Sequence, residues 1–266
     1  MLLGKLVRLS RLFNEHSGRM VTIAIDHTIG YGVIPGLESI QKTVDILVEA
    51  KPDAIMMHKG IAERCFSTHA GKVGFILQSA AASPFQPNME LPTTDVSEAI
   101  ALGADAISVA ITVGGANQPR QTEHLGRIVR DARITGLPVV AHCYPKGESI
   151  PEDERFNVEN VLYAARVGAE LGVDIIKTYY TGSSETFARV VESVPALVVA
   201  AGGPKVSDLD QMLETVQDIM KAGAAGITYG RNIWQDPDPI GVVAALNAIV
   251  HEDATSAQAA NIYKSR

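Results

Sequence analysis

Several polar residues of this chain directly follow short apolar runs, at the point where a buried strand would end. Lys177 comes after Asp174-Ile175-Ile176, so burial of its ammonium group would be costly unless it paired with a carboxylate or lost its proton. A lysine amine whose pKa falls from ~10.4 toward neutrality can attack a carbonyl carbon and form an imine. The alternative is a structural ion pair, for which Asp26 is a candidate partner. Lys177 is therefore a candidate Schiff-base nucleophile.

Two further residues could move protons beside Lys177. Tyr144 lies in His-Cys-Tyr-Pro-Lys-Gly (142 to 147), just past an apolar run, where its phenol could exchange protons with a bound substrate. A packing role before a proline turn is the alternative. Asp26 ends another apolar run and could orient the lysine, transfer protons, or form only structural hydrogen bonds. We take Lys177, Tyr144 and Asp26 as the candidate catalytic residues.

Two glycine-containing segments predict an anion site. Residues 201 to 205 read Ala-Gly-Gly-Pro-Lys, and Ser207 is placed to cap the next helix, which would leave backbone N–H groups available to an anion. Residues 230 to 232 read Gly-Arg-Asn, in which Arg231 could add a forked contact. Loops after strands seven and eight of barrel enzymes commonly hold phosphate. Gly202, Gly203, Gly230 and Arg231 are thus the predicted phosphate-binding residues.

Three histidines at the ends of apolar runs allow a competing interpretation. His27, His58 and His142 could together ligate a catalytic zinc ion, which would make the chain a zinc-dependent lyase or hydrolase. No His-x-His pair marks such a site, and a single histidine at a strand end usually forms only hydrogen bonds. We predict no metal and no cofactor. A phosphosugar-binding protein without catalysis is a third interpretation that the sequence leaves open.

The apolar runs themselves predict eight parallel strands. Helical patterns separate the runs, which is typical of βαβ units, and no Gly-x-Gly-x-x-Gly of an open doubly wound sheet follows the first run. We therefore predict an α/β fold with one closed (β/α)8 TIM barrel. The predicted strands are 21–26, 54–58, 73–78, 106–110, 138–142, 174–177, 196–200 and 226–229, and the clearest helices are 37–50, 122–135, 158–171 and 209–222.

Length and composition indicate one domain over residues 1–266. The chain is 46% hydrophobic and 20% charged and shows no linker or change of composition, apart from a longer polar, proline-containing insertion at 79–94. Residues 1–20 should form an additional N-terminal helix and a lead-in. Lys5, Arg8 and Arg11 recur at helical spacing in this apolar stretch and no cleavage site follows, which argues against a signal peptide.

Charge and cysteine content limit the partners and the compartment. The formal net charge of −7 argues against nucleic acid or an anionic membrane as the main partner. No apolar run approaches the roughly 18 residues that a membrane span requires. Cys65 and Cys143 show neither metal-finger spacing nor a disulfide framework, which indicates a reducing compartment and hence the cytoplasm.

Seven segments, taken together, match a known family over nearly the whole chain. They are Leu-Val-Arg-Leu-Ser-Arg-Leu-Phe (6 to 13), Asp26-His27, His-Lys-Gly-Ile (58 to 61), Tyr-Pro-Lys-Gly (144 to 147), Lys177 with Thr-Gly at 181 and 182, Ala-Gly-Gly-Pro-Lys (201 to 205) and Gly-Arg-Asn-Ile-Trp-Gln (230 to 235). Through them the chain resembles the class I (Schiff-base) aldolases of the archaeal-type fructose-bisphosphate aldolase and 2-amino-3,7-dideoxy-D-threo-hept-6-ulosonate synthase family. The first and third segments look closer to the heptulosonate synthase branch.

The resemblance implies roles for the candidate residues. Lys177 would be the Schiff-base lysine, Tyr144 the proton donor or acceptor, and Asp26 a catalytic helper. The substrate-binding residues that we predict are His27, Thr28, Ile29, Gly30, Pro145, Lys146, Gly202, Gly203, Gly230 and Arg231. The resemblance also implies a homo-oligomeric ring.

The heptulosonate synthase branch implies a transaldolase-type reaction. A three-carbon unit from a phosphorylated deoxyhexodiulose would be joined to aspartate semialdehyde, an aldehyde acceptor, toward aromatic amino acid precursors. Alternatives are a fructose-bisphosphate aldolase and a dihydroxyacetone-phosphate-dependent aldolase of secondary metabolism. The partners are then a small phosphorylated keto substrate and an aldehyde.

Three residues depart from the usual pattern of this family. Thr28 stands where glycine usually follows Asp-His, Lys146 where arginine is usual, and Ser183 where an acidic residue is common. Thr28 and the aromatic Tyr31 should reshape the pocket near the first strand. We therefore expect the class of reaction to be that of the family, and the acceptor aldehyde to differ from those named above or to be one of them.

Overall fold

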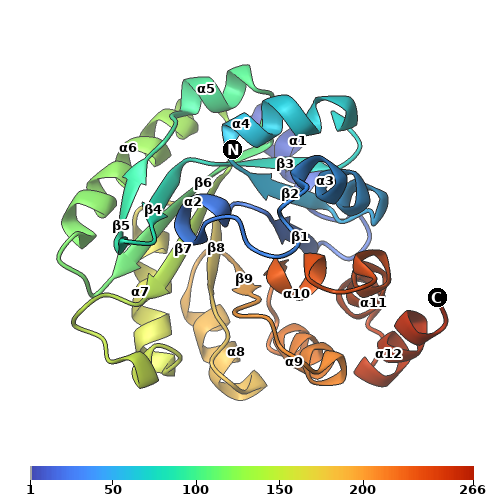
Figure 1. The fold of residues 1–266 in the computed structure, drawn as a ribbon. Coiled ribbons are helices and arrows are strands. Elements are labelled where there is room, and N and C mark those ends of the chain that lie inside the picture. The colour runs from blue at the N-terminus through green and yellow to red at the C-terminus, as the bar shows by residue number, and fades with distance from the viewer. Residues whose placement is uncertain (1) are drawn as a thin grey trace.

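A closed barrel of eight parallel strands lies at the centre of the molecule, with helices around it (Figure 1). The structure is a computed structural model that describes residues 2–266, so Met1, part of the predicted domain, lies outside the described residues. In order around the barrel the strands are β1 (Met20–Ala24), β2 (Ala54–Met57), β3 (Gly74–Gln78), β6 (Ala106–Val113), β7 (Val139–Pro145), β8 (Ile175–Tyr179), β9 (Leu197–Ala201) and β10 (Gly226–Tyr229), which pairs with β1. The predicted (β/α)8 fold is confirmed.

The helices follow the predicted alternation. The longer ones are α1 (Leu3–Leu12), α3 (Ile40–Glu49), α5 (Val96–Ala101), α6 (Gln118–Thr135), α7 (Val158–Glu170), α8 (Ser184–Ser193), α9 (Leu209–Lys221), α11 (Pro239–Glu252) and α12 (Ser256–Lys264). The shorter ones are α2 (Thr28–Tyr31), α4 (Lys59–Ile61), η1 (Ala62–Phe66), η2 (Ser67–His69), η3 (Glu152–Glu154) and α10 (Arg231–Trp234). No helix in the range 2–266 is both long enough and apolar enough to cross a membrane.

One predicted helix cap is wrong. Ser207 does not cap α9, because that helix begins at Leu209 and Asp208 is its N-cap. The Asp208 carboxylate accepts hydrogen bonds from the N–H groups of Asp210 and Gln211. Serine and aspartate are both good N-caps, so their adjacency here made the starting residue of the helix ambiguous in the sequence.

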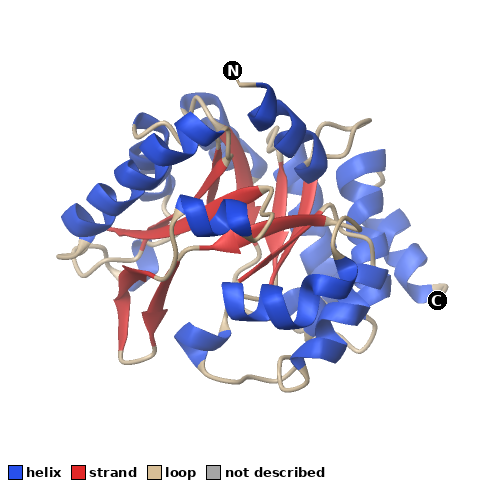
Figure 2. Cartoon of the chain, turned by 90° about the horizontal axis from the view of Figure 1, so that it is seen from above, coloured by secondary structure: helices blue, strands red, loops and turns tan. Residues whose placement is uncertain are grey.

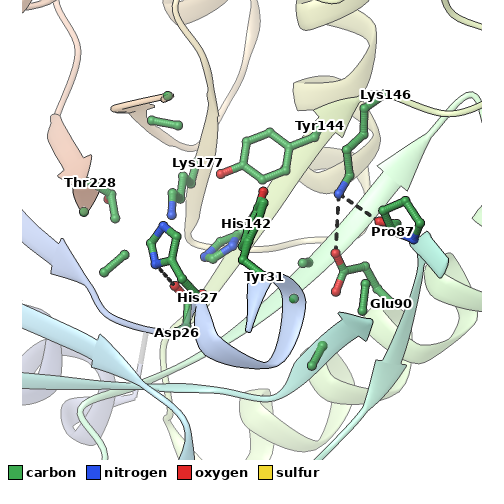
Figure 3. A pocket seen from close by; sticks show the side chains of 18 of the residues that line it. Asp26, His27, Tyr31, Pro87, Glu90, His142, Tyr144, Lys146, Lys177 and Thr228 are labelled. Atoms are coloured by element: carbon green, nitrogen blue, oxygen red, sulfur yellow. Dashed lines mark hydrogen bonds and ion pairs between the residues drawn. The ribbon is translucent and has the colours of Figure 1, made fainter. Parts of the chain in front are cut away.

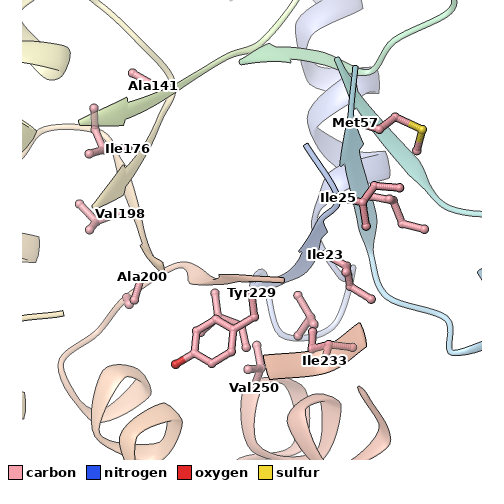
Figure 4. Close-up of a cluster of buried hydrophobic side chains, with 14 of the residues drawn as sticks. Ile23, Ile25, Met57, Ala141, Ile176, Val198, Ala200, Tyr229, Ile233 and Val250 are labelled. Atoms are coloured by element: carbon pink, nitrogen blue, oxygen red, sulfur yellow. The ribbon is translucent and has the colours of Figure 1, made fainter. Parts of the chain in front are cut away.

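Alternation along each strand separates two apolar layers. One set of side chains points outward and packs between the strands and the helices, as Figure 4 shows for Ala141, Ile176 and Val198. The intervening residues point into the barrel, where Val140 and Ile175 join a smaller apolar cluster that Leu12 of α1 closes at one end. Successive side chains of a strand face opposite sides. Therefore His142 and Tyr144 of β7, and Lys177 of β8, also point inward.

The chain adds an antiparallel hairpin to the barrel. Residues 79–94, predicted as an insertion, form β4 (Ala80–Ser83) and β5 (Gln86–Pro92). Figures 1 and 2 place this hairpin at the end of the barrel opposite to α1. The side chain of Gln121 in α6 donates a hydrogen bond to the Asn88 carbonyl and so fastens the hairpin to the barrel.

Two strands are longer than predicted. β6 and β7 pair as far as Val113 and Pro145, whereas the predicted strands end at residues 110 and 142. Tyr144 is consequently part of a hydrogen-bonded strand and does not lie in a loop after it. A strand fixes the direction of a side chain more firmly than a loop does, which matters for a residue that must transfer a proton.

Candidate active site

A cavity of about 630 Å³ opens at the end of the barrel where the strands have their C-termini. All three predicted catalytic residues lie on its wall, and so do most of the predicted substrate-binding residues. Those on the wall are Asp26, His27, Gly30, Tyr144, Lys146, Lys177, Gly202, Gly203, Gly230 and Arg231. The wall is completed by residues of the β4–β5 hairpin.

Lys177 is buried inside the barrel. It lies opposite His142 in the register of β7 and β8, and only 6% of its surface is exposed. Burial lowers the pKa of Lys177 because the ammonium group loses water, while the charge of Asp26 acts in the opposite direction. The shift favours the neutral amine, the form that attacks a carbonyl group.

Asp26 is a carboxylate among several nitrogen-bearing groups. Burial alone would raise its pKa, but the positive charges around it, those of His27 and His142 when protonated and that of Lys177, outweigh burial and bring the pKa to about 2. Its closest basic contact is His27, with 3.4 Å between Oδ1 and Nδ1. Asp26 therefore acts on Lys177 through space and stays ionised at any pH near neutrality. The structure favours this arrangement over the closely bonded Lys177–Asp26 pair that the sequence allowed.

The environment of two histidines in the cavity wall, His142 and His27, favours the neutral form. Burial lowers the pKa of His142 well below its usual value, and the neighbouring charge of Lys177 lowers it further. Burial also lowers the pKa of His27, against the opposing effect of Asp26. Neutral imidazoles add no positive charge beside Lys177, so they leave the amine and the Asp26 carboxylate as the reactive pair.

Tyr144 points its hydroxyl group toward Lys177 (Figure 3). Its ring stacks on that of Tyr179, with 4.6 Å between the centroids. Burial raises the pKa of Tyr144 well above its usual value, and the nearby Tyr179 and Asp26 raise it further. The phenol is thus protonated, rigidly placed and able to donate a proton to an oxygen atom bound near Lys177.

A second lysine at a strand end shows the structural alternative. Lys59 directly follows His58, the predicted last residue of the second strand, and β2 itself ends at Met57. Its ammonium group lies 2.8 Å and 3.0 Å from the two carboxylate oxygens of Glu98. Its side chain is 43% exposed. Lys59 is an ordinary ion-pair partner, whereas Lys177 is the desolvated one.

The predicted phosphate-binding segments lie side by side at the ends of β9 and β10. A Cβ atom on Gly202 would come within 2.6 Å of the Tyr229 ring, and one on Gly230 within 2.7 Å of the His27 ring. These two glycines are therefore required by close packing within the protein. Gly203 adopts a positive φ of +66° with open space around it.

Asn232 joins the two segments. Its side-chain amide donates hydrogen bonds to the carbonyls of Gly202 and Pro204 and accepts one from the Val206 N–H. Arg231 adds a bond from Nη2 to the Gly203 carbonyl, while its Nε is buried without a hydrogen-bond partner among residues 2–266. The segments form a fixed, positively charged wall.

Three predicted substrate-binding residues are not part of the cavity wall that the described residues form. Pro145 belongs to the outward-facing set of β7, one position after the inward Tyr144. Thr28 and Ile29 open the short helix α2, which turns them away, so that Ile29 is 47% exposed. Gly30 and Tyr31 of the same helix do line the cavity.

The three histidines of the zinc alternative line the cavity but are not grouped as metal ligands. Within residues 2–266, no three His, Cys, Asp or Glu side chains lie close enough to hold one metal ion. His27 and His58 follow β1 and β2, whereas His142 lies within β7, so the three come from different parts of the wall. The geometry thus gives the zinc interpretation no ligand set.

The sequence did not reveal several wall residues. Glu90 comes from the hairpin and pairs with Lys146, and Arg155 follows η3 and has a buried Nε without a partner in the described chain. Tyr179, two positions after Lys177, also faces inward. Strand alternation could have identified Tyr179. Glu90 and Arg155 carry no comparable signal, because their segments reach the cavity only through the tertiary fold.

Comparison with known proteins gives consistent results. Residues 20–236 match the model of the DeoC/LacD family aldolases. The chain is 36% identical over 253 residues to a 2-amino-3,7-dideoxy-D-threo-hept-6-ulosonate synthase of Halobacterium salinarum, which covers 94% of this chain and 93% of that protein. It is 30% identical to a 2-amino-4,5-dihydroxy-6-oxo-7-(phosphonooxy)heptanoate synthase of Streptomyces griseus, with 94% and 91% covered.

A solved structure of a Schiff-base-forming fructose-1,6-bisphosphate aldolase superposes with a TM-score of 0.85. It shares 31% sequence identity, and the match covers 92% of this chain and 99% of that one. The similarity therefore extends over the barrel and the cavity described above.

Proposed function

Because the chain belongs to the DeoC/LacD aldolase family, we propose that it is a class I aldolase whose Lys177 forms a Schiff base with a small phosphorylated keto compound. The family that the sequence motifs predicted is confirmed. The observation that carries the proposal is the desolvated Lys177 amine, which faces the Tyr144 hydroxyl and the Asp26 carboxylate inside one cavity.

The chemistry follows from these three groups. The neutral Lys177 amine attacks the donor carbonyl, and the carbinolamine takes up a proton and loses water. The cationic imine then draws electrons from the adjacent carbon–carbon bond, which releases a carbonyl compound and a proton, or from the adjacent carbon–hydrogen bond, which releases a proton to solvent. The resulting enamine carbon attacks the acceptor aldehyde, and Tyr144 supplies the proton that the new alkoxide takes up. Asp26, with its pKa of about 2, provides a permanent negative charge that stabilises the cationic imine. Hydrolysis then releases the product and regenerates the amine.

The donor phosphate is assigned to the β9–β10 side of the cavity. Gly203, Gly230 and Arg231 would supply backbone and guanidinium groups there, while Gly202, whose N–H bonds to the Thr228 carbonyl, allows the close packing, and Asn232 holds the two segments together. Phosphate at this position would leave the carbonyl carbon near Lys177, because β8 is the neighbour of β9 in the barrel.

The acceptor that we propose is aspartate semialdehyde. The names of both synthases similar to this chain describe seven-carbon 2-amino keto acids. An aldol disconnection of such a product between C4 and C5 leaves a four-carbon amino acid aldehyde and a three-carbon ketone. The enzyme would then serve aromatic amino acid precursors or a related secondary pathway. Cleavage of fructose 1,6-bisphosphate is the second candidate, favoured by the solved aldolase structure.

Three further assignments belong to this proposal. Residues 1–266 would act as one barrel domain with residues 1–20 as its N-terminal helix and lead-in. The protein would work in the cytoplasm as a homo-oligomeric ring, in which the exposed apolar side chains of α1, such as Leu3 and Leu6, would be covered. Sedimentation of the purified protein tests the assembly.

Imine trapping tests the central assignment. Reduction with borohydride in the presence of dihydroxyacetone phosphate should add the mass of the reduced ligand to the peptide that contains Lys177. The Lys177→Ala variant should take up none. Lys59, the exposed lysine at another strand end, is the internal control and should remain unmodified. An adduct on Lys59 alone, or turnover by Lys177→Ala, would overturn the proposal.

A further inference from the structure

The side of the cavity away from the phosphate-binding segments carries its own pair of charges. Lys146, directly after β7, and Glu90, from β5 of the hairpin, lie 3.6 Å apart between Nζ and Oε1. In Figure 3 the Tyr144 ring lies between this pair on one side and Lys177 with Thr228 on the other. The pair therefore occupies the space next to Tyr144 where an acceptor would approach the enamine.

The contact between the two groups is incomplete. A strong charged hydrogen bond joins nitrogen and oxygen at about 2.7–2.9 Å, and the Lys146–Glu90 distance is longer. Lys146 also donates to the Pro87 carbonyl at 3.2 Å. Glu90 is only 10% exposed at its side chain, so its carboxylate has lost most of its water without a close replacement. Both groups retain capacity to bind a ligand.

The surroundings disfavour further negative charge. Burial raises the pKa of Glu90, Lys146 lowers it, and the charge of Asp26 raises it again, so the two carboxylates already repel each other. A phosphorylated acceptor would add roughly two further negative charges at the same place. An acceptor with one ammonium and one carboxylate group would instead add no net charge and could bind both members of the pair.

We propose that Glu90 and Lys146 form the specificity site for the acceptor, with Glu90 binding an ammonium group and Lys146 a carboxylate. Glu90 thereby selects an amino acid aldehyde and disfavours a phosphorylated one. This inference rests on the proposed function, because it names the recognition of the acceptor in the same cavity. It also assigns a task to the hairpin, which brings Glu90 to the barrel wall.

Acceptor competition tests the inference. With dihydroxyacetone phosphate as donor, kcat/KM is measured for aspartate semialdehyde, glyceraldehyde 3-phosphate and uncharged glyceraldehyde. Glu90→Gln should lower kcat/KM for aspartate semialdehyde by about 10- to 100-fold, the usual range for a lost hydrogen bond to a charged group. It should raise the value for glyceraldehyde 3-phosphate and change that for glyceraldehyde by less than about threefold.

A matched control separates recognition from simple loosening of the hairpin. Glu148 also binds the hairpin, through the Asn88 amide, but it does not line the cavity. Glu148→Gln should leave the ratio between the acceptors unchanged. Equal changes for all three acceptors in Glu90→Gln, or the same shift of preference in Glu148→Gln, would overturn the inference.

The donor half-reaction separates this inference from the proposed function. Exchange of a donor proton into deuterated water requires Lys177 and no acceptor. Exchange in wild type and Glu90→Gln without a change of acceptor preference would refute only the role of Glu90. Failure of wild type to exchange the proton or to form the imine would refute the aldolase itself.

Discussion

Buried charged groups are paired closely at one end of the barrel and incompletely at the other. At the N-terminal end, Asp53, Asp105 and Asp174 each precede a strand and accept the N–H of a residue in the neighbouring strand. Each also contacts a cationic or imidazole side chain, namely His251, Arg11 and Lys5, at 3.1, 3.1 and 2.8 Å. These carboxylates have close partners on both sides, so this end is a fixed structural layer.

The C-terminal end lacks such complete pairing. Among residues 2–266, Nε2 of His142 and Nε of Arg231 are buried without a hydrogen-bond partner, and Lys177 is desolvated beside Asp26. Polar groups that are left incompletely satisfied cost stability but can bind a ligand strongly. The comparison shows where the fold is stabilised and where it is prepared for chemistry.

The structural layer also has a period. Asp53, Asp105 and Asp174 precede β2, β6 and β8, which alternate around the barrel with β3, β7 and β9. Ala225 holds the equivalent place before β10, and its N–H bonds to the Val198 carbonyl as that of Asp105 bonds to Phe75. This arrangement thus recurs before every second strand, and Ala225 takes the place of the carboxylate at one of the four positions.

The largest expected effect is the loss of catalysis in a Lys177→Met variant. Methionine fills a similar volume but has no amine, so aldol turnover should fall by at least about 10⁴-fold. Because a desolvated amino group is replaced by an apolar side chain, the free energy of unfolding should stay the same or increase. Urea denaturation and initial rates measure the two quantities. A loss of more than about 2 kcal/mol of unfolding free energy would show that Lys177 stabilises the fold. The two ends of the barrel would then not differ in the way described above.

The opposite outcome is expected for Asp174→Ala at the N-terminal end. The change leaves the Lys5 ammonium without its carboxylate and the Val139 N–H without its side-chain acceptor. The expected cost is about 3 kcal/mol of unfolding free energy, since breaking a buried pair and exposing an unsatisfied donor both contribute. Below the unfolding transition, kcat/KM should remain within about twofold of wild type.

An exposed pair provides the control for Asp174. Asp218 contacts Lys221 one turn away on the surface of α9, and Asp218→Ala should cost less than about 1 kcal/mol. If the two alanine variants lost equal amounts of unfolding free energy, the aspartates that precede the strands would contribute no more to stability than a surface ion pair. If Asp174→Ala lost activity while folded, the two ends would be coupled.

The sequence predicted those features that depend on local periodicity. The position of polar residues at the ends of apolar runs led to Lys177, Tyr144 and Asp26, and the order of strands and helices led to the barrel. Neighbours from distant segments were not predictable in the same way. The sequence does not indicate that Lys59 meets Glu98, 39 residues away, whereas no carboxylate among residues 2–266 lies as close to the Lys177 amine. The partner decides which lysine is an ion pair and which is a candidate nucleophile.

The remaining differences between the sequence-based predictions and the structure have the same origin. The insertion at 79–94 was recognised, but its hairpin and the contact of Glu90 with Lys146 depend on how it packs against β7. Thr28 and Ile29 belong to the predicted substrate-binding residues. In the structure both lie in α2 and neither lines the cavity, and a motif in the sequence does not give that placement.

The smallest expected effect is a change in the titration of Lys177, which sharpens the comparison at its reactive end. Burial lowers the pKa of Lys177 and Asp26 opposes this, so Asp26→Asn should lower the pKa further. Reaction of the amine with acetic anhydride should therefore begin at a lower pH in Asp26→Asn, as followed by the mass of the Lys177 peptide. Lys42, exposed on α3, is labelled in parallel and reports any change in the reagent. A shift to higher pH would contradict the electrostatic role of Asp26, because loss of a neighbouring carboxylate can only destabilise the ammonium form.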